Sequence, residues 1–457
     1  MKNVLFIITD DQRHDALGAA GNKDILTPNL DRLAARGTMF TQAHIPGGTS
    51  GAVCMPSRAM LNTGRTLFSL EGEGGNIPAE HTTMAEVYKN AGFDTYVIGK
   101  WHNGTPAVTR GFCGGDNIFF GGMWDHWNVP VNRFDPTGEY DNVINFTANF
   151  FYDNKVVRFH CDKFNPGVHS STLLTDTAID YIKNKEDGKP FFLYLSYLAP
   201  HDPRTMPKEF LEMYDPDKID LPANFLTEHP FEFGQQHERD ELLAPMPRTE
   251  ENTRKQLAEY YAMVTHLDYE VGRLLDELDS NGLAGDTLIV FTSDNGLGVG
   301  SHGLFGKQNL YDHSVRVPLI LAGPDIPKGE MVDNYVYLLD IMPTLCDLCG
   351  LPIPESVEGK SFARMFEDKN YKTRETLYLA FTKYIRAVKD DRYKYIVYRN
   401  HADCVQLFDL ADDPLEMRNL AEDDEYINVR KGLKTLLYTH RDEWRDGNHV
   451  FSKAFWG

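Results

Sequence analysis

The sequence NVLFIITDD occupies residues 3–11 and decides the fold that we expect. Its first seven residues are almost wholly apolar, which is typical of a strand that is buried on both faces of a parallel sheet. Asp10 and Asp11 follow at once, so this strand would deliver two carboxylates at its carboxyl end. An open α/β sheet binds its ligands at that end of its strands.

Alternating strands and helices fill most of the chain. The further predicted strands include 95–98, 190–201 and 286–295, and the predicted helices include 27–37, 171–185 and 251–281. This alternation predicts an α/β fold with a large, mostly parallel sheet that is sandwiched by helices. The polar residues expected to gather beyond the strand ends are Asp10, Asp11, Lys100, His102, His201, Asp294 and Asn295.

The character of the sequence changes near residue 371. From there to residue 457 it predicts antiparallel strands with polar turns and then a helix over 425–445. We therefore expect a catalytic α/β domain over 1–370 and a smaller C-terminal α+β subdomain over 371–457. Residues 111–170 are rich in Gly, Asn, Asp and aromatic residues and weak in periodicity, which indicates an insertion that faces the substrate.

Composition and charge limit the partners of this protein. Its 457 residues carry a formal net charge of −21, which argues against a nucleic-acid partner because phosphate binding needs a basic surface. No apolar stretch is long enough to span a membrane, and the first residues lack the long apolar region of a signal peptide. The sequence as printed predicts a cytoplasmic protein, or a periplasmic or secreted one if an export signal was removed.

The cysteines do not indicate a zinc site or a disulfide framework. Of the six, Cys346 and Cys349 form a lone CxxC within an apolar stretch that is predicted to be a helix. Without a second pair or neighbouring histidines, buried packing is the better interpretation of this pair.

Polar groups at two strand ends predict a metal site instead. Asp10 and Asp11 at one end, with Asp294 and Asn295 at another, offer only oxygen ligands. Such ligands suit Ca²⁺, with Mg²⁺ as the alternative, and do not suit zinc.

Basic residues in glycine-rich or strand-end segments would surround this metal. They are Lys100, His102, His201, His302 and Lys307. Beside an oxygen-ligated cation, lysines would neutralise the charge of a tetrahedral oxyanion and histidines would transfer protons. This combination indicates hydrolysis of a sulfate or phosphate ester.

A single cysteine stands in the polar, glycine-rich stretch PGGTSGAVCMPSRAMLNTGR, residues 46–65. A helix is predicted to begin beside Cys54, with Pro56 in its first turn, and to end at Gly64. The N-terminus of a helix favours negative charge beside Cys54, and Arg58 can hold an oxyanion or the side chain of residue 54. A core thiol fits such a loop poorly, so Cys54 is the candidate nucleophile.

These motifs resemble those of the type I, formylglycine-dependent sulfatases, a family of the alkaline phosphatase-like superfamily that includes bacterial carbohydrate sulfatases. CMPSR and TGR, at 54–58 and 63–65, are similar to the family signature. IITDDQR, IGKWHNG, LAPHDP, FTSDNGLGVGSHGLFGK and VQLFDLADDPLEMRNLA follow the family's order along nearly the whole chain. The resemblance implies a sulfuric ester hydrolase.

The resemblance also implies an unusual nucleophile and a calcium ion. A formylglycine-generating maturation enzyme would oxidise Cys54 to an aldehyde, which exists as its hydrate, and Arg58 would hold that hydrate. One hydroxyl of a hydrate can take the sulfuryl group, and the other can then lose its proton and expel sulfate. The residues that match the calcium ligands are Asp10, Asp11, Asp294, Asn295 and modified residue 54.

The family pattern implies roles for the basic residues as well. Lys100 and Lys307 would bind sulfate oxygens, and His102 would assist removal of a proton from the hydrate. His201 is the candidate general acid beside the leaving oxygen. His302 lies in the matching glycine-rich loop and is expected on the substrate side.

The substrate is predicted from the loops. Several side chains there are of the kinds that stack on sugar rings or bind acidic groups: Trp124, His126, Trp127, Arg133, His169, Arg204 and Arg239. Packing beneath a long loop is the alternative explanation for the aromatic ones. Because these loops lack hydrophobic bulk, we expect a small sulfated substrate, a mono- or oligosaccharide, rather than an aryl or steroid sulfate.

Two other functions are compatible with parts of this pattern. Phosphonate monoester and phosphodiester hydrolases share the fold and the cysteine motif, but they lack the Lys/His pair that GKWHNG supplies here. A catalytically silent, calcium-stabilised binding protein is expected if Cys54 is not oxidised. Classical alkaline phosphatases would use Ser or Thr at position 54 and a histidine-rich zinc site, which this sequence lacks.

Overall fold

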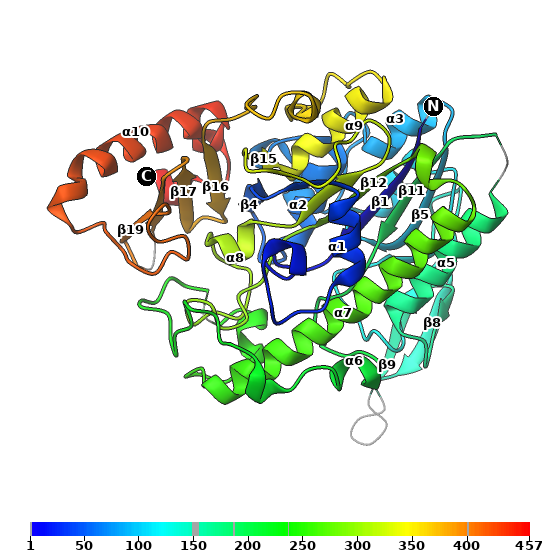
Figure 1. Ribbon diagram of the computed structural model, residues 1–457, viewed down its shortest axis with the longest axis horizontal. Helices are drawn as coiled ribbons and strands as arrows, with labels where there is room; N and C mark the ends of the chain where they lie inside the picture. Colours follow the sequence, from blue (N-terminus) through cyan, green and yellow to red (C-terminus); the bar gives the residue numbers. More distant parts are fainter. Residues whose placement is uncertain (1, 149–154, 186–187, 236, 400–401) are drawn as a thin grey trace.

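A computed structural model describes residues 2–148, 155–185, 188–235, 237–399 and 402–457. Its central feature is an eight-stranded sheet (Figure 1). In order across the sheet, the strands are β14 (Glu330–Val332), β2 (Gly37–Phe40), β13 (Leu319–Ala322), β12 (Thr287–Ser293), β1 (Asn3–Thr9), β11 (Phe191–Ser196), β5 (Asp94–Trp101) and β6 (Gly114–Phe120). The apolar run that precedes Asp10 thus lies in the middle of the sheet.

The sheet is mostly parallel, as predicted. β12, β1, β11, β5 and β6 pair in parallel, while β13 runs antiparallel to both of its neighbours. Their parallel direction brings the carboxyl ends of β1, β5, β11 and β12 to one edge, where the predicted site residues follow.

Helices cover both faces of the sheet. On one face lie α1 (Pro28–Ala35), α5 (Ser170–Asn184) and α7 (Glu250–Ser280), and on the other lie α2 (Cys54–Thr63), α3 (Met84–Asn90) and α9 (Ile341–Cys349). Leu5 and Ile7 belong to the apolar core under α7, and Val4 and Phe6 belong to the core under α2. Successive side chains of a strand point to opposite faces, so a strand covered on both sides must be apolar throughout.

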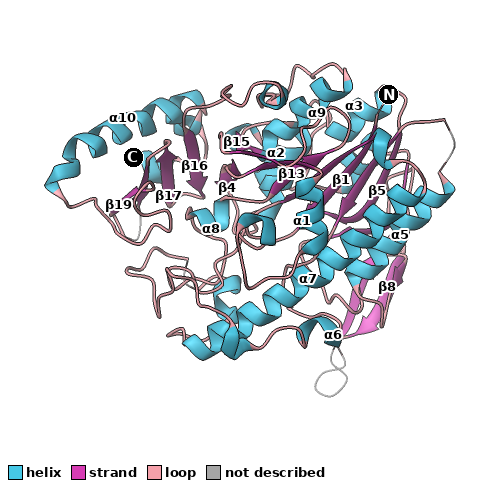
Figure 2. Cartoon of the chain, viewed as in Figure 1, coloured by secondary structure: helices cyan, strands magenta, loops and turns pink. Residues whose placement is uncertain are grey.

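The C-terminal part forms a second sheet, in the order β19-β18-β17-β16-β4. Its strands are β16 (Leu377–Phe381), β17 (Ile385–Lys389), β18 (Tyr393–Tyr398), β19 (Val405–Asp409) and β4 (Gly47–Gly48). Figure 2 shows this sheet beside α10 (Ile427–Glu443), apart from the central sheet. The predicted C-terminal α+β subdomain is confirmed, including its antiparallel strands and its helix.

One strand of the small sheet comes from the N-terminal part of the chain. β4 pairs in parallel with β16 and precedes the loop that leads to Cys54. The loop is therefore anchored on the C-terminal subdomain, and the division at residue 371 stays a prediction.

The region predicted as an insertion is partly built into the central sheet. Residues 114–120 form β6, which pairs with β5, so this part differs from the expectation. The remaining strands of the region are β7 (Pro130–Val131), β8 (Val143–Thr147), β9 (Val156–His160) and β10 (Lys163–Phe164). Residues 149–154, between β8 and β9 in the sequence, lie outside the described residues.

Shorter elements complete the described chain. The remaining strands and α-helices are β3 (Ala43–His44), β15 (Val336–Tyr337), α4 (Thr105–Gly111), α6 (Lys208–Leu211), α8 (Asp312–Val315) and α11 (Lys453–Trp456). The 3-10 helices are η1 (Gly18–Ala20), η2 (Leu67–Ser69), η3 (Gly72–Gly74), η4 (Pro216–Lys218), η5 (Arg239–Leu243), η6 (Ala284–Asp286), η7 (Leu338–Asp340), η8 (Ala363–Phe366), η9 (Asp424–Tyr426) and η10 (Asp446–Asn448). In the described part of the chain, no helix combines the length and the apolar composition that crossing a lipid bilayer requires.

Candidate active site

Residues that follow or end four strands meet in one buried cluster. Asp10 and Asp11 follow β1, Lys100 lies near the end of β5, His201 comes after β11, and Asp294 follows β12. All five are at most 4% exposed. The predicted gathering of polar residues at this edge of the sheet therefore exists.

Cys54 joins this cluster from the first turn of α2. The helix ends at Gly64, whose φ of 64° is the left-handed conformation that glycine adopts most readily. The Cys54 sulfur lies 3.4 Å from His102 Nδ1 and 3.8 Å from Lys100 Nζ. Burial raises the pKa of the Cys54 thiol to about 11, so an unmodified thiol stays protonated at neutral pH and is a weak nucleophile.

Arg58 ties α2 to the ends of two strands. Its Nε donates to Asp294 Oδ2 at 2.7 Å, and its Nη1 donates to Ser196 Oγ at 2.6 Å. Its Nη2 lies 3.7 Å from Asp10 Oδ2. The guanidinium, only 1% exposed, thus offsets the charges of two buried carboxylates, and Ser57 Oγ adds a bond of 2.6 Å to the carbonyl oxygen of Asp294.

The oxygen atoms of the cluster fit a divalent cation. Two sets of possible ligand atoms each lie within 4.8 Å of one another: carboxylate oxygens of Asp10 and Asp294 with the Cys54 sulfur, and carboxylate oxygens of Asp10 and Asp11 with a ring nitrogen of His201. Asp10 Oδ1 and Asn295 Oδ1 are buried and have no hydrogen-bond partner among the described residues. Buried polar atoms are rarely left unpaired, and carboxylate and amide oxygens are the donors that Ca²⁺ and Mg²⁺ prefer. The residues present therefore fit a hard cation.

Two lysines balance part of the negative charge of the cluster. Lys100 Nζ donates to Asp10 Oδ2 and to the carbonyl oxygen of Gly122. Lys307 Nζ donates to Asp11 Oδ1 at 2.6 Å. Burial alone would raise the pKa of Asp10, but the positive charges around it, that of Lys100 first among them, together outweigh burial and hold that pKa below its usual value. Both ammonium groups contact the carboxylates of the cluster and can bind an incoming oxyanion.

The two histidines differ in their surroundings. Burial lowers the pKa of His102 to about 2, so His102 is neutral beside Cys54. His201 Nδ1 lies 2.9 Å from the carbonyl oxygen of Asp202, and because a carbonyl only accepts, Nδ1 must carry a proton. His201 Nε2 is thus the nitrogen that faces the cluster, 3.7 Å from Asp11 Oδ2.

Two histidines predicted to contact the substrate lie beneath the site. His126 and His169 are 1% and 2% exposed, and their rings stack 5.2 Å apart. His126 Nε2 donates to the carbonyl oxygen of His201 at 2.9 Å, and its Nδ1 accepts from Ser170 Oγ at 2.7 Å. With both nitrogens in use, His126 supports the main chain of His201 and has no free atom for a substrate.

The predicted tryptophans form hydrogen bonds with neighbouring residues, and His302 stacks on a tyrosine. Trp124 Nε1 donates to the carbonyl oxygen of Asn128 at 3.0 Å, and Trp127 Nε1 donates to Thr205 Oγ1 at 2.7 Å. The ring of His302 stacks at 4.0 Å on Tyr311, and the side chain is 5% exposed. None of these contacts brings the three side chains to the cluster around Cys54.

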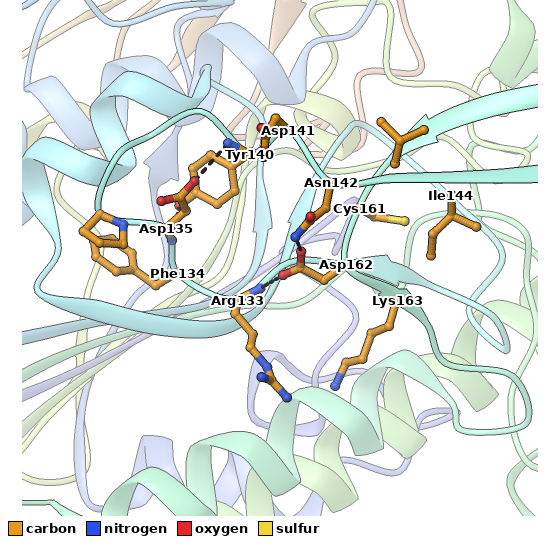
Figure 3. A pocket seen from close by; sticks show the side chains of 12 residues that line it. Arg133, Phe134, Asp135, Tyr140, Asp141, Asn142, Ile144, Cys161, Asp162 and Lys163 are labelled. Atoms are coloured by element: carbon orange, nitrogen blue, oxygen red, sulfur yellow. Dashed lines mark hydrogen bonds between the residues drawn. The ribbon is translucent and has the colours of Figure 1, made fainter.

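The predicted arginines occupy three different places. Arg133 lines an open cavity of about 700 Å³, where its side chain extends in the same direction as that of Lys163 (Figure 3). Arg204 Nη1 donates to Gln256 Oε1, while its Nε and Nη2 are buried without a partner among the described residues. Arg239 binds Asp202, beside His201.

Three contributors to the site were not found from the sequence. Ser196 at the end of β11 binds Arg58, Gly122 binds Lys100 through its carbonyl oxygen, and Asp202 binds His201. The position of Asp202 next to His201 in LAPHDP was a usable signal, whereas nothing near Gly122 in the sequence indicates its contact.

The chain matches known proteins over nearly its whole length. The sulfatase family matches residues 2–351, and the C-terminal region of N-sulphoglucosamine sulphohydrolase matches residues 300–443. A protein named sulfatase from Formosa agariphila is 31% identical over 99% of this chain and 90% of its own length.

Solved structures share the fold at lower identity. A structure described as a complex with its substrate D-glucosamine-2-N,6-O-disulfate has a TM-score of 0.79 and 23% identity, over 98% of this chain and 99% of its own. The phosphonate monoester hydrolase of Agrobacterium radiobacter has a TM-score of 0.75 and 24% identity, over 97% and 96% of the two chains. Since the family match covers most of the chain and the strand ends carry the predicted cluster, this protein belongs to the sulfatase family.

Proposed function

We propose that this sulfatase hydrolyses a sulfate ester on a mono- or oligosaccharide, with oxidised Cys54 as its nucleophile. The observation that carries the proposal is the position of Cys54. Its sulfur lies at the start of α2, 3.4 Å from His102 Nδ1 and 3.8 Å from Lys100 Nζ, inside the carboxylate cluster. A saccharide is supported by the structural neighbour that was solved in complex with a disulfated glucosamine as its substrate.

Oxidation by a formylglycine-generating maturation enzyme would give residue 54 two hydroxyls on one carbon after hydration. One hydroxyl would attack sulfur and release the sugar alcohol, and the other would lose its proton as the aldehyde re-forms and sulfate leaves. The neutral His102 ring, close to residue 54, suits removal of that proton.

Calcium, or Mg²⁺ in its place, would neutralise the charge of the bound sulfate and favour ionisation of the attacking hydroxyl. Its proposed ligands are Asp10, Asp11, Asp294, Asn295 and modified residue 54. Lys100 and Lys307 would bind sulfate oxygens, and Arg58 would hold the hydrate while it balances Asp10 and Asp294. These fixed charges act in a buried cluster, where electrostatic stabilisation is strongest.

His201 would protonate the leaving oxygen. Its Nδ1 proton is engaged by Asp202, so Nε2 is the atom available for proton transfer. A sugar alkoxide is a poor leaving group and requires this proton, whereas an acidic phenol does not.

The runner-up function is phosphonate monoester or phosphodiester hydrolysis, which the fold of a structural neighbour favours. The contact of both Lys100 and His102 with Cys54 supports the sulfatase alternative. A silent calcium-binding protein is expected only if Cys54 stays unoxidised.

Parallel assays with matched esters test the proposal. We expect kcat/KM for 4-nitrophenyl sulfate to exceed that for 4-nitrophenyl phenylphosphonate by at least about tenfold, because Lys100 and His102, the pair expected of sulfatases and not of phosphonate hydrolases, both contact residue 54. Because both esters release 4-nitrophenolate, the leaving group does not contribute to the difference between the two rates. Sulfate release from a panel of sulfated mono- and disaccharides then tests the substrate class. Faster turnover of the phosphonate than of 4-nitrophenyl sulfate would overturn the proposed sulfatase activity. Faster turnover of aryl sulfates than of every sulfated sugar would overturn the proposed substrate class.

A further inference from the structure

We propose that η5 is a positioning element, which holds His201 from one end and the loop that carries Lys307 from the other. It lies between α6 and α7, in a stretch from which the sequence suggested only Arg239. The inference rests on the proposed roles of His201 and Lys307 and extends them to residues that are not among the proposed ligands of the sulfate or the metal.

The first contact of η5 reaches His201 through Asp202. Arg239 donates to both carboxylate oxygens of Asp202, from Nη1 at 2.6 Å and from Nη2 at 3.1 Å. Asp202 Oδ1 lies 3.2 Å from His201 Nδ1. A bidentate guanidinium fixes the plane of a carboxylate, and this carboxylate in turn limits the rotation of the imidazole. The direction of His201 Nε2 therefore depends on Asp202, through both its carbonyl oxygen and its carboxylate, and Arg239 holds that carboxylate.

The second contact holds the loop over residues 304–308. Glu241 accepts hydrogen bonds from the main-chain N–H groups of Phe305 at 2.8 Å and Gly306 at 2.7 Å. A Cβ on Gly306 would lie only 2.9 Å from Glu241 Oε1, so η5 and the loop approach as closely as the missing side chain permits. Lys307 comes next in the chain and contacts Asp11.

The third contact passes through Gln308. Its Nε2 donates to Asp240 Oδ2 at 2.7 Å and to the carbonyl oxygen of Gly51 at 3.0 Å. Its Oε1 accepts from the main-chain N–H of Lys307 at 3.0 Å. Gly51 belongs to the loop that leads into α2. The side chain of Gln308 thus joins η5 to the two segments that carry Lys307 and Cys54.

The carboxylates of these contacts are buried, whereas the arginine is not. Asp202, Asp240 and Glu241 have side chains that are 8%, 3% and 3% exposed, whereas the Arg239 side chain is 47% exposed. Arg239 can therefore be shortened without opening a core cavity, and the buried Asp202 then loses the partner that orients it. Outer partners of this kind typically change activity by about 10- to 100-fold.

A comparison of Arg239→Ala with the native protein on two sulfate esters, phenyl sulfate and 4-nitrophenyl sulfate, tests the inference. We expect kcat for phenyl sulfate to fall by about 10- to 100-fold, and kcat for 4-nitrophenyl sulfate to fall much less, because nitrophenolate leaves without a proton. KM should change little, since Asp202 engages both Nη atoms of Arg239. Arg239→Lys should restore part of the loss.

Arg392→Ala is the matched control. Arg392 is 53% exposed and binds both oxygens of Asp409, which is 3% exposed, in the C-terminal sheet. Its loss should leave the ratio of the two rates unchanged. An equal fall on both esters for Arg239→Ala, or no fall on either, would overturn the positioning role of Arg239.

Two further variants separate the parts of the inference. Gln308→Ala should reduce both rates by a similar factor, because Lys307 binds sulfate whatever the leaving group; unchanged rates would remove the second half of the proposal. The fall in kcat caused by His201→Ala should also be larger for phenyl sulfate than for 4-nitrophenyl sulfate. If His201→Ala shows this difference and Arg239→Ala does not, the positioning role of Arg239 is wrong and the proposed function stands. If His201→Ala shows no difference, the general-acid role proposed for His201 is wrong.

Discussion

Replacing Cys54 with alanine should lower turnover of every sulfate ester by about 10⁴- to 10⁶-fold, the range expected when a covalent nucleophile is lost. The substitution removes one sulfur from the first turn of α2, and Cys54 is 2% exposed. We therefore expect the free energy of unfolding to fall by only about 1 kcal/mol. Steady-state kinetics and urea unfolding measure the two quantities on the same preparation.

A buried cysteine outside the site provides the control. Cys346 is 1% exposed and lies in α9, so Cys346→Ala removes the same atom from the core at a similar cost in stability. This variant should retain its activity. If Cys54→Ala kept substantial turnover, or if it unfolded while Cys346→Ala did not, the role of residue 54 would be structural.

Asp294→Asn should abolish the rise in Tm on addition of Ca²⁺ and most of the sulfatase activity. In the native protein, binding of Ca²⁺ to the folded state alone should raise Tm, and the variant lacks one of the carboxylate charges that would hold the ion. The amide keeps an oxygen that can still accept from Arg58 Nε, so the calcium-free fold should persist. We expect activity to fall by about 100-fold or more, because a metal contributes several kcal/mol to stabilising the transition state.

Asp340→Asn separates metal loss from general destabilisation. Asp340 is fully buried, accepts from the main-chain N–H of Tyr337 at 2.8 Å and binds Arg374, but it is not among the proposed metal ligands. This variant should have a lower Tm and an unchanged rise on addition of Ca²⁺. Native-like activity of Asp294→Asn after treatment with a chelator would contradict the metal assignment.

The centre of the fold and of the site could be predicted from the sequence because both depend on local patterns. An apolar run such as 3–9 requires cover on both faces, and the polar residue after it must lie at the edge of the sheet. The segment from Cys54 to Gly64 contains the signals for both ends of α2: Pro56 lies in its first turn and Gly64 ends it. Long, strongly patterned elements are the ones that such reasoning finds most reliably.

Other features could not be predicted because they depend on partners far along the chain. The apolar strand β13 has the same pattern whichever way it runs, so its antiparallel direction was not visible. The two-residue strand β4 is defined only by its pairing with β16. Side-chain type alone also does not distinguish His126, which supports His201 from below, from a histidine that faces a substrate.

Mass spectrometry of active protein tests the central claim most directly. The peptide that contains residues 54–58 should be about 18 Da lighter than its unmodified cysteine form, as expected for conversion of the thiol to the aldehyde. Across preparations with different degrees of conversion, kcat per molecule should rise in proportion to the converted fraction. Full sulfatase activity from protein whose Cys54 is entirely an unmodified thiol would contradict the account.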